Sequence, residues 1–138
     1  MATERIGIVA TRFHPEIMDP MLEEALAKAK ELGVTVTKVC RVPGSFDLPL
    51  LAQQLLRRED VDGVVTLGAL VTGETDHDQL IAYAAAEALT RLSLEYKKPV
   101  TLGITGPQQT YEQAVARIPR AGEIVESCVH MIRELRDL

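Results

Sequence analysis

The feature that most constrains the fold of this chain is a regular alternation between short apolar runs and longer segments with helical periodicity. Residues 6–10 form a short apolar run, and residues 16–32 follow with apolar side chains near every third or fourth position. The same pair of signals recurs along the chain. Because the strands of a parallel sheet are covered by helices on both faces, this alternation predicts parallel strands joined by crossover helices.

Turn and capping residues mark the ends of these elements. Strands are expected at residues 6–10, 34–42, 61–67 and 99–104. Helices are expected at residues 16–32, 47–57, 75–96, 110–118 and 120–135. Gly33 is predicted to end the first helix, and a loop is predicted at residues 70–75. Thr110 with Gln113, and Thr75 with Asp78, have the spacing of a capping box at a helix start.

Residues 1–138 are therefore expected to form one α/β domain. Right-handed crossovers limit its topology to a flavodoxin-like three-layer α/β/α sandwich with a four-stranded parallel sheet. The 138 residues are 46% hydrophobic and 25% charged, which is typical of a globular protein with a buried core. Cys40 and Cys128 show no metal or redox spacing and are expected to be inert thiols.

Charge and hydropathy exclude several classes of partner. The net charge is −5 and no block of lysines and arginines stands out, so a nucleic-acid partner is not expected. No apolar run approaches the length of a membrane span, and the N-terminus lacks the pattern of a signal peptide. These features predict a cytoplasmic protein with no membrane partner.

The residues with the most distinctive chemistry follow the predicted strands. In parallel sheets, ligands bind beyond the carboxyl ends of the strands. Both phenylalanines of the chain, Phe13 and Phe46, fall in these segments. They could fill the core, or an aromatic ring could stack on a ligand. Ser45 and Asp47 could cap the next helix, or they could bind the hydroxyls of a polyol.

A helix start near His77 could bind an anion. The backbone N–H groups of Gly73, Glu74 and Thr75 precede a predicted helix, and such groups bind anions. His77 lies in its first turn, where the helix dipole favours a neutral imidazole that can act as a base. His77 could equally be a surface residue with no role. Arg117 ends a later helix and could either complement that helix end or bind a phosphate.

Three segments together resemble lumazine synthases, and most closely the archaeal branch. They are residues 42–49 (VPGSFDLP), residues 67–78 (LGALVTGETDHD) and residues 112–117 (EQAVAR). The resemblance covers the chain from Ile6 to Leu135. It implies condensation of 5-amino-6-(D-ribitylamino)uracil with 3,4-dihydroxy-2-butanone 4-phosphate to give 6,7-dimethyl-8-ribityllumazine, phosphate and water. The reaction needs proton transfer and neither a cofactor nor a metal.

The resemblance also assigns roles to individual residues. His77 would be the proton donor and acceptor. The residues that would contact the uracil substrate are Phe13, Ser45, Phe46, Asp47, Ala69, Leu70, Val71 and Leu102. Phe13 would stack on the pyrimidine, residues 45–47 would hold the ribityl chain, and residues 69–71 would offer backbone groups. The residues that would bind the phosphate are Glu74, Thr75 and Arg117.

A homo-oligomer built on pentamers is implied as well. Its active sites would be shared between subunits, with Leu102 and Arg117 contributed by the neighbouring chain. The partners would otherwise be the two small-molecule substrates. The helix at residues 75–96 is rich in alanine, and small side chains allow the close packing expected at such an interface.

Four positions bear on how closely the chain follows the family pattern. Asp47 stands where the family usually has glutamate, and Leu102 stands where many members have phenylalanine. Glu123 replaces a basic residue, for which Arg120 could substitute. Glu126 matches a frequent carboxylate, with no role assigned to it.

Three other functions are weighed against this one. Archaeal-type riboflavin synthases, as a family, lack the segment at residues 73–77 and the phenylalanine at position 46. A lumazine- or flavin-binding protein without catalysis would not need His77 and Arg117. A response-regulator-like domain would need an acidic cluster after the first strand and an aspartate at the end of the third, and neither is present.

Overall fold

In the computed structural model, which describes residues 3–73 and 75–138, four parallel strands form one sheet in the order β2-β1-β3-β4. The strands are β1 (Arg5–Thr11), β2 (Thr35–Val42), β3 (Gly63–Val71) and β4 (Val100–Gln109). The helices are α1 (Pro15–Leu32), α2 (Leu48–Leu56), α3 (His77–Tyr96), α4 (Tyr111–Ala116) and α5 (Arg120–Arg136). A single 3-10 turn, η1 (Ser45–Asp47), precedes α2. The predicted flavodoxin-like sandwich is confirmed.

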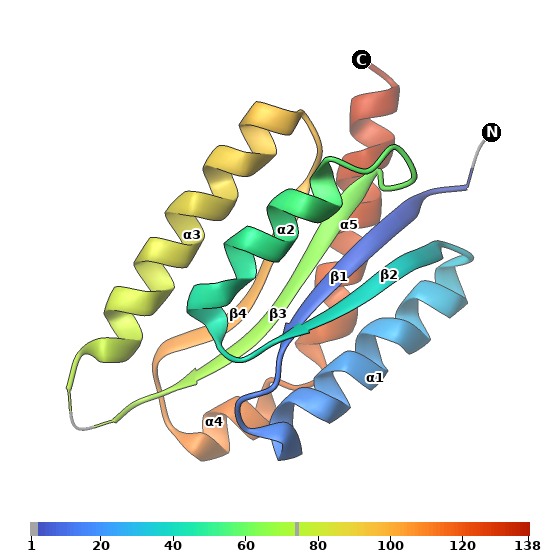
Figure 1. The fold of residues 1–138 in the computed structure, drawn as a ribbon. Helices are drawn as coiled ribbons and strands as arrows, with labels where there is room; N and C mark the ends of the chain where they lie inside the picture. The colour runs from blue at the N-terminus through green and yellow to red at the C-terminus, as the bar shows by residue number, and fades with distance from the viewer. Residues whose placement is uncertain (1–2, 74) are drawn as a thin grey trace.

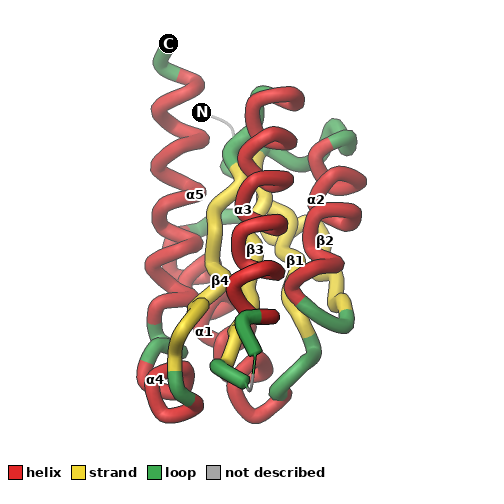
Figure 2. The backbone as a smooth tube through the Cα atoms, turned by 90° about the vertical axis from the view of Figure 1, so that its left-hand side faces the viewer, coloured by secondary structure: helices red, strands yellow, loops and turns green. Residues whose placement is uncertain are grey.

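The helices cover both faces of the sheet (Figures 1 and 2). α1 and α5 lie on one face and α2 and α3 on the other, while α4 sits at the edge where the strands end. Alternate side chains of each strand enter different cores. Ile6 and Ile8 of β1 pack under α1 and α5, whereas Val9 packs under α2. Burial on both faces explains why the strands read as continuous apolar runs in the sequence.

Two predicted helix ends are confirmed. Gly33 ends α1 in the left-handed region, at φ 72°, which costs glycine little because it has no Cβ. At the start of α4, the Gln113 N–H donates to Thr110 Oγ1 at 3.1 Å, and the Thr110 N–H donates to Gln113 Oε1 at 2.9 Å. These two bonds satisfy backbone donors that the first turn of a helix leaves without partners.

The third and fourth strands are longer than predicted, and the loop predicted at residues 70–75 begins too early. β3 continues to Val71 and β4 to Gln109. The sequence predicts that the third strand ends at residue 67. In the structure, β3 continues beyond this residue because it pairs with β4, and the last pair is Val71 with Gln109. A tertiary partner therefore decides where β3 ends, which local sequence does not encode.

The predicted capping box of Thr75 and Asp78 is wrong. α3 begins at His77, and the Asp78 carboxylate does not reach back to a capping residue. Asp78 is buried and its Oδ2 accepts a hydrogen bond from the Gln108 N–H at 2.9 Å. Thr75 Oγ1 accepts a longer bond, 3.3 Å, from the His77 N–H. The first turn of α3 is thus tied to the end of β4.

Two further expectations concern the reactivity of the cysteines and the absence of a membrane span. Cys128 is buried beneath the sheet, and this burial raises the pKa of its thiol to about 12, so the thiol is unreactive. Cys40 is half-buried and also free. None of the helices formed by residues 3–73 and 75–138 combines the length and apolar character needed to cross a membrane.

Candidate active site

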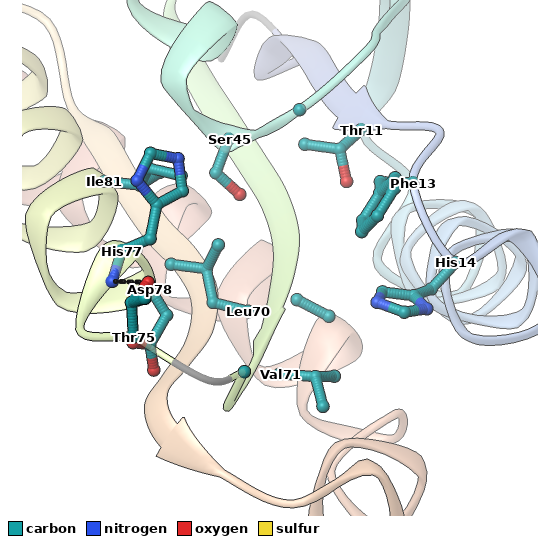
Figure 3. Close-up of a pocket in the computed structure, with 13 residues that line it drawn as sticks. Thr11, Phe13, His14, Ser45, Leu70, Val71, Thr75, His77, Asp78 and Ile81 are labelled. Atoms are coloured by element: carbon teal, nitrogen blue, oxygen red, sulfur yellow. Dashed lines mark hydrogen bonds between the residues drawn. The ribbon is translucent and has the colours of Figure 1, made fainter.

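A cavity of about 240 Å³ opens at the carboxyl edge of the sheet, where the sequence placed the site (Figure 3). Segments far apart in the chain meet there: the turn after β1, the turn η1, the end of β3 and the first turns of α3. The lining residues are Thr11, Phe13, His14, Gly44, Ser45, Ala69, Leu70, Val71, Gly73, Thr75, His77, Asp78 and Ile81. Six of these thirteen residues have polar side chains, but most of the lining surface is apolar, which is typical of a small-molecule site.

His77 and Phe13 stand on opposite walls of this cavity. In Figure 3 the His77 imidazole lies on the side formed by α3, beside Ile81, and the Phe13 ring lies across from it. Leu70 of β3 lies between the two walls. The Phe13 side chain is 66% exposed, so the alternative that it fills the core is wrong. An exposed ring that faces a cavity is available to stack on a planar ligand.

The turn η1 brings Ser45 to the cavity and holds Asp47 by a backbone bond. Ser45 is buried against the end of β3, where an added Cβ on Gly68 would lie 2.6 Å from Ser45 Oγ. Asp47 Oδ2 accepts a hydrogen bond from the Gly44 N–H at 3.0 Å. Asp47 stands at the start of α2, but its side chain makes no capping hydrogen bond to that helix; its bond to Gly44 closes η1 and uses one of the two carboxylate oxygens.

The start of α3 faces the same cavity. Thr75 and His77 line it side by side, joined by the bond from the His77 N–H to Thr75 Oγ1. The predicted phosphate residue Glu74 lies outside the described residues. The first N–H groups of a helix carry partial positive charge, so this end of the cavity suits an anion.

His14 also lines the cavity, although sequence reasoning assigned it no role. Its backbone is in the left-handed region, at φ 58°, which turns its ring toward the cavity beside Phe13. His14 Nδ1 lies 3.5 Å from Glu16 Oε1, which also accepts a hydrogen bond from Tyr111 Oη at 3.1 Å. The Glu16 backbone N–H, helped by Tyr111 and His14, lowers the pKa of the Glu16 carboxyl. A positive φ at histidine has no clear sequence signal.

Four predicted site residues lie away from this cavity. Phe46 and Asp47 line a separate hollow beside α2, and the Phe46 side chain is 67% exposed. Leu102 and Arg117 line another cavity, of about 250 Å³, between β4 and the start of α5. Arg120 lines that cavity as well. Within one chain, the structure therefore separates Arg117 from His77.

The chain matches the family model for 6,7-dimethyl-8-ribityllumazine synthase over residues 3–136. It belongs to the lumazine synthase family. Relatives of that name include one from Picrophilus torridus, 53% identical over 96% of this chain and 97% of its own length. Others come from Methanopyrus kandleri, 48% identical over 100% and 98%, and Sulfolobus acidocaldarius, 49% identical over 96% and 85%. The predicted resemblance is confirmed, and the riboflavin synthase and binding-protein alternatives are not favoured.

Two charged residues of α5, Arg120 and Glu126, have different surroundings. Arg120 lines the same cavity as Arg117, whereas Glu123 is not among the residues that line it. Glu126 instead pairs with Lys28, with Glu126 Oε1 2.8 Å from Lys28 Nζ. This pair joins α5 to α1, so Glu126 has a structural contact away from the cavity.

We expect Gly68→Ala to lower kcat/KM by about tenfold to a hundredfold, since small displacements in an active site have large effects. The added methyl group would lie 2.6 Å from Ser45 Oγ and must push Ser45 out of place. Steady-state kinetics would measure the effect. Gly122→Ala in α5 is the control, because its Cβ meets Lys28 only at ordinary contact distance, 3.4 Å. Equal kinetics of the two variants would show that the position of Ser45 is unimportant.

Proposed function

We propose that this lumazine synthase forms 6,7-dimethyl-8-ribityllumazine in the cavity between Phe13 and His77. The observation that carries the proposal is the exposed Phe13 ring facing the His77 imidazole across a cavity at the carboxyl edge of the sheet. An aromatic wall suits the planar pyrimidine, and an imidazole suits the proton transfers of the condensation.

The pyrimidine is proposed to lie against the end of β3. β1 pairs with β3 only as far as Ala10 and Leu67, so β3 extends beyond its neighbour. On the other side, a register irregularity between Ala69 and Val71 leaves Leu70 without a partner residue in β4. Backbone N–H and C=O groups that are not hydrogen-bonded to a neighbouring strand can bind the polar edge of a pyrimidine. This supports the assignment of Ala69, Leu70 and Val71 to substrate binding.

The ribityl chain is assigned to the turn η1. Ser45 lines the cavity directly, and Phe46 and Asp47 follow it on the same turn. The Gly44 N–H occupies Asp47 Oδ2, so Oδ1 is the oxygen that would accept ribityl hydroxyls. The aspartate is one methylene shorter than the glutamate usual in the family, so the ribityl chain must approach this turn more closely.

The phosphate is assigned to the start of α3, where Thr75 lines the cavity and Glu74 precedes it in sequence. The backbone N–H groups of this first turn attract an anion. His77 is in the same turn, so a proton acceptor stands beside the group that leaves. In the proposed reaction, His77 removes and returns protons as the imine forms, phosphate is eliminated and the second ring closes.

A neighbouring subunit is proposed to complete the site with Leu102 and Arg117, in a homo-oligomer built on pentamers. The separation of these residues from the His77 cavity within one chain supports this arrangement. Large apolar side chains are also exposed on the outer sides of α2 and α3, namely Leu50, Leu80, Tyr83 and Leu94. Exposed apolar surface of this kind is typical of subunit interfaces. We propose a cytoplasmic location for the assembled enzyme.

The decisive experiment incubates the purified protein with the ribitylaminouracil and the butanone phosphate and follows the lumazine chromophore. Enzyme-dependent appearance of the chromophore is the expected result. Tight binding of 6,7-dimethyl-8-ribityllumazine without turnover would contradict catalysis and would favour a lumazine-binding protein without enzymatic activity. Absence of both turnover and binding would contradict the assignment of this cavity.

Arg117→Ala is expected to raise KM for the butanone phosphate by about tenfold to a hundredfold, the usual effect of losing a hydrogen bond to a charged group. The KM for the ribitylaminouracil, which carries no phosphate, should change little. Arg58→Ala is the control, because Arg58 pairs with Asp60 in the loop before β3, at the opposite edge of the sheet. An unchanged KM for the phosphate substrate would remove Arg117 from the phosphate site.

A further inference from the structure

The guanidinium of Arg117 is held by a fully buried amide at the end of β4. Gln109 has a relative exposure of 0%, and its Oε1 accepts a hydrogen bond from Arg117 Nη1 at 2.7 Å. Its Nε2 donates to Thr105 Oγ1 at 2.8 Å. Thr105 Oγ1 in turn donates to the Gly68 carbonyl at 3.4 Å, so the chain of contacts ends on β3.

We propose that Gln109 is a positioning residue for Arg117 and that its neutral amide sets the affinity for the phosphate. This inference rests on the proposed role of Arg117 as the phosphate-binding arginine. The orientation of the Gln109 amide is fixed by chemistry, because a guanidinium has only donors and must face Oε1. Turning the amide over would set two donors, Gln109 Nε2 and Arg117 Nη1, against each other and would lose the bond to Arg117.

One bond to Gln109 leaves the rest of the guanidinium available. Among the residues that the structure describes, Arg117 Nε and Nη2 have no hydrogen-bond partner. A guanidinium edge with two free donors can bind a phosphate in the bidentate manner. Arg117 follows the short helix α4, and anchoring Nη1 removes side-chain freedom that would otherwise be lost when phosphate binds.

Phosphate binding depends on the amide being uncharged as much as on its position. A carboxylate at position 109 would hold Arg117 more firmly but would offset the charge that attracts the phosphate. An apolar side chain would leave the charge free but would release the guanidinium. Glutamine holds the guanidinium by a hydrogen bond without neutralising its positive charge. Replacement in either direction should therefore weaken phosphate binding, and for opposite reasons.

The experiment measures KM for both substrates, kcat, and inhibition by inorganic phosphate, in Gln109→Leu, Gln109→Glu, Arg117→Ala and the double variant Gln109→Leu/Arg117→Ala. We expect both Gln109 variants to raise KM for the butanone phosphate and the inhibition constant of inorganic phosphate by about threefold to tenfold, the usual effect of one lost or compensated hydrogen bond. The kcat and the KM for the ribitylaminouracil should stay within about twofold. The double variant should bind phosphate no worse than Arg117→Ala, because the two residues act as one unit.

The outcomes separate this inference from the proposed function. If Arg117→Ala weakens phosphate binding while both Gln109 variants bind it normally, the positioning role is overturned and the assignment of Arg117 stands. If Arg117→Ala itself binds phosphate normally, the assignment of Arg117 fails and the inference falls with it. Additive effects in the double variant would show that Gln109 acts independently of Arg117 and would also overturn the proposal. Gln109→Glu, which keeps the size of the side chain, tests the need for an uncharged amide even if Gln109→Leu does not fold, and normal phosphate binding in that variant would overturn the proposal.

Discussion

The His77→Ala variant should form lumazine about a hundredfold to ten-thousandfold more slowly than the wild type, the range expected for loss of a general acid–base group. His77 lines the cavity from the first turn of α3 and faces Phe13 across it. Methyl cannot transfer protons, so imine formation, phosphate elimination and ring closure would depend on water. Binding depends on other walls of the cavity, so the loss should fall on kcat more than on either KM.

His130→Ala is the matched control for this measurement. His130 is an exposed histidine of α5, 3.9 Å from Glu134, and it lies outside the cavity. The same substitution there should leave kcat unchanged. Thermal unfolding of both variants should match the wild type, because neither imidazole packs in the core. A loss below tenfold in His77→Ala, with the fold intact, would show that His77 is not the proton-transfer group.

The architecture of the sheet could be predicted from the sequence because its signals are local and repeated. Apolar runs such as residues 6–10 and the capping pair Thr110 and Gln113 act over a few residues, and the structure forms them as expected. The carboxyl ends of β3 and β4 could not be predicted in this way. Their extension depends on pairing between Val71 and Gln109, 38 positions apart in the chain, which no local pattern encodes.

The residues of the candidate site differ in the same way: those with a local sequence signal could be predicted, and those that depend on tertiary contacts could not. Phe13, Ser45 and His77 could be placed at one edge of the sheet because each follows a strand, and the cavity brings them together. His14 could not be identified, since its orientation depends on a backbone conformation that histidine adopts only occasionally. The spacing of Thr75 and Asp78 predicts a helix cap, whereas Asp78 accepts a hydrogen bond from the Gln108 N–H of β4.

The buried network behind Arg117 shows a second limit of sequence reasoning. Gln109 lies beyond the predicted end of the fourth strand, and nothing in the sequence there marks a glutamine as fully buried. Gln109 is buried because its amide finds Arg117 and Thr105 at the same time, and each bond makes the other favourable. The resemblance to the family identified Arg117 but not the residue that holds it.

The proposal that two subunits build each site predicts that two impaired variants regain activity when they are mixed. His77→Ala lacks the proton-transfer group, and Arg117→Ala is impaired at phosphate-substrate concentrations well below the wild-type KM. If the two are unfolded, mixed in equal amounts and refolded together, some sites combine an intact His77 from one subunit with an intact Arg117 from its neighbour. Random assembly in a ring makes about one site in four intact, so the mixture should reach about a quarter of the wild-type rate.

The control for this mixing experiment joins two variants from the same side of the site. His77 and Phe13 line one cavity of a single chain, so mixing His77→Ala with Phe13→Ala gives every subunit one lesion in that cavity and no intact site. No recovery is expected there. Recovery only with Arg117→Ala would place Arg117 on the neighbouring subunit. If the His77→Ala and Arg117→Ala mixture is no more active than the average of its components, His77 and Arg117 serve the same site from one chain, and the shared site is wrong. The cavity beside β4 would then have to open toward His77 within the subunit, a rearrangement that the separation of the two cavities argues against.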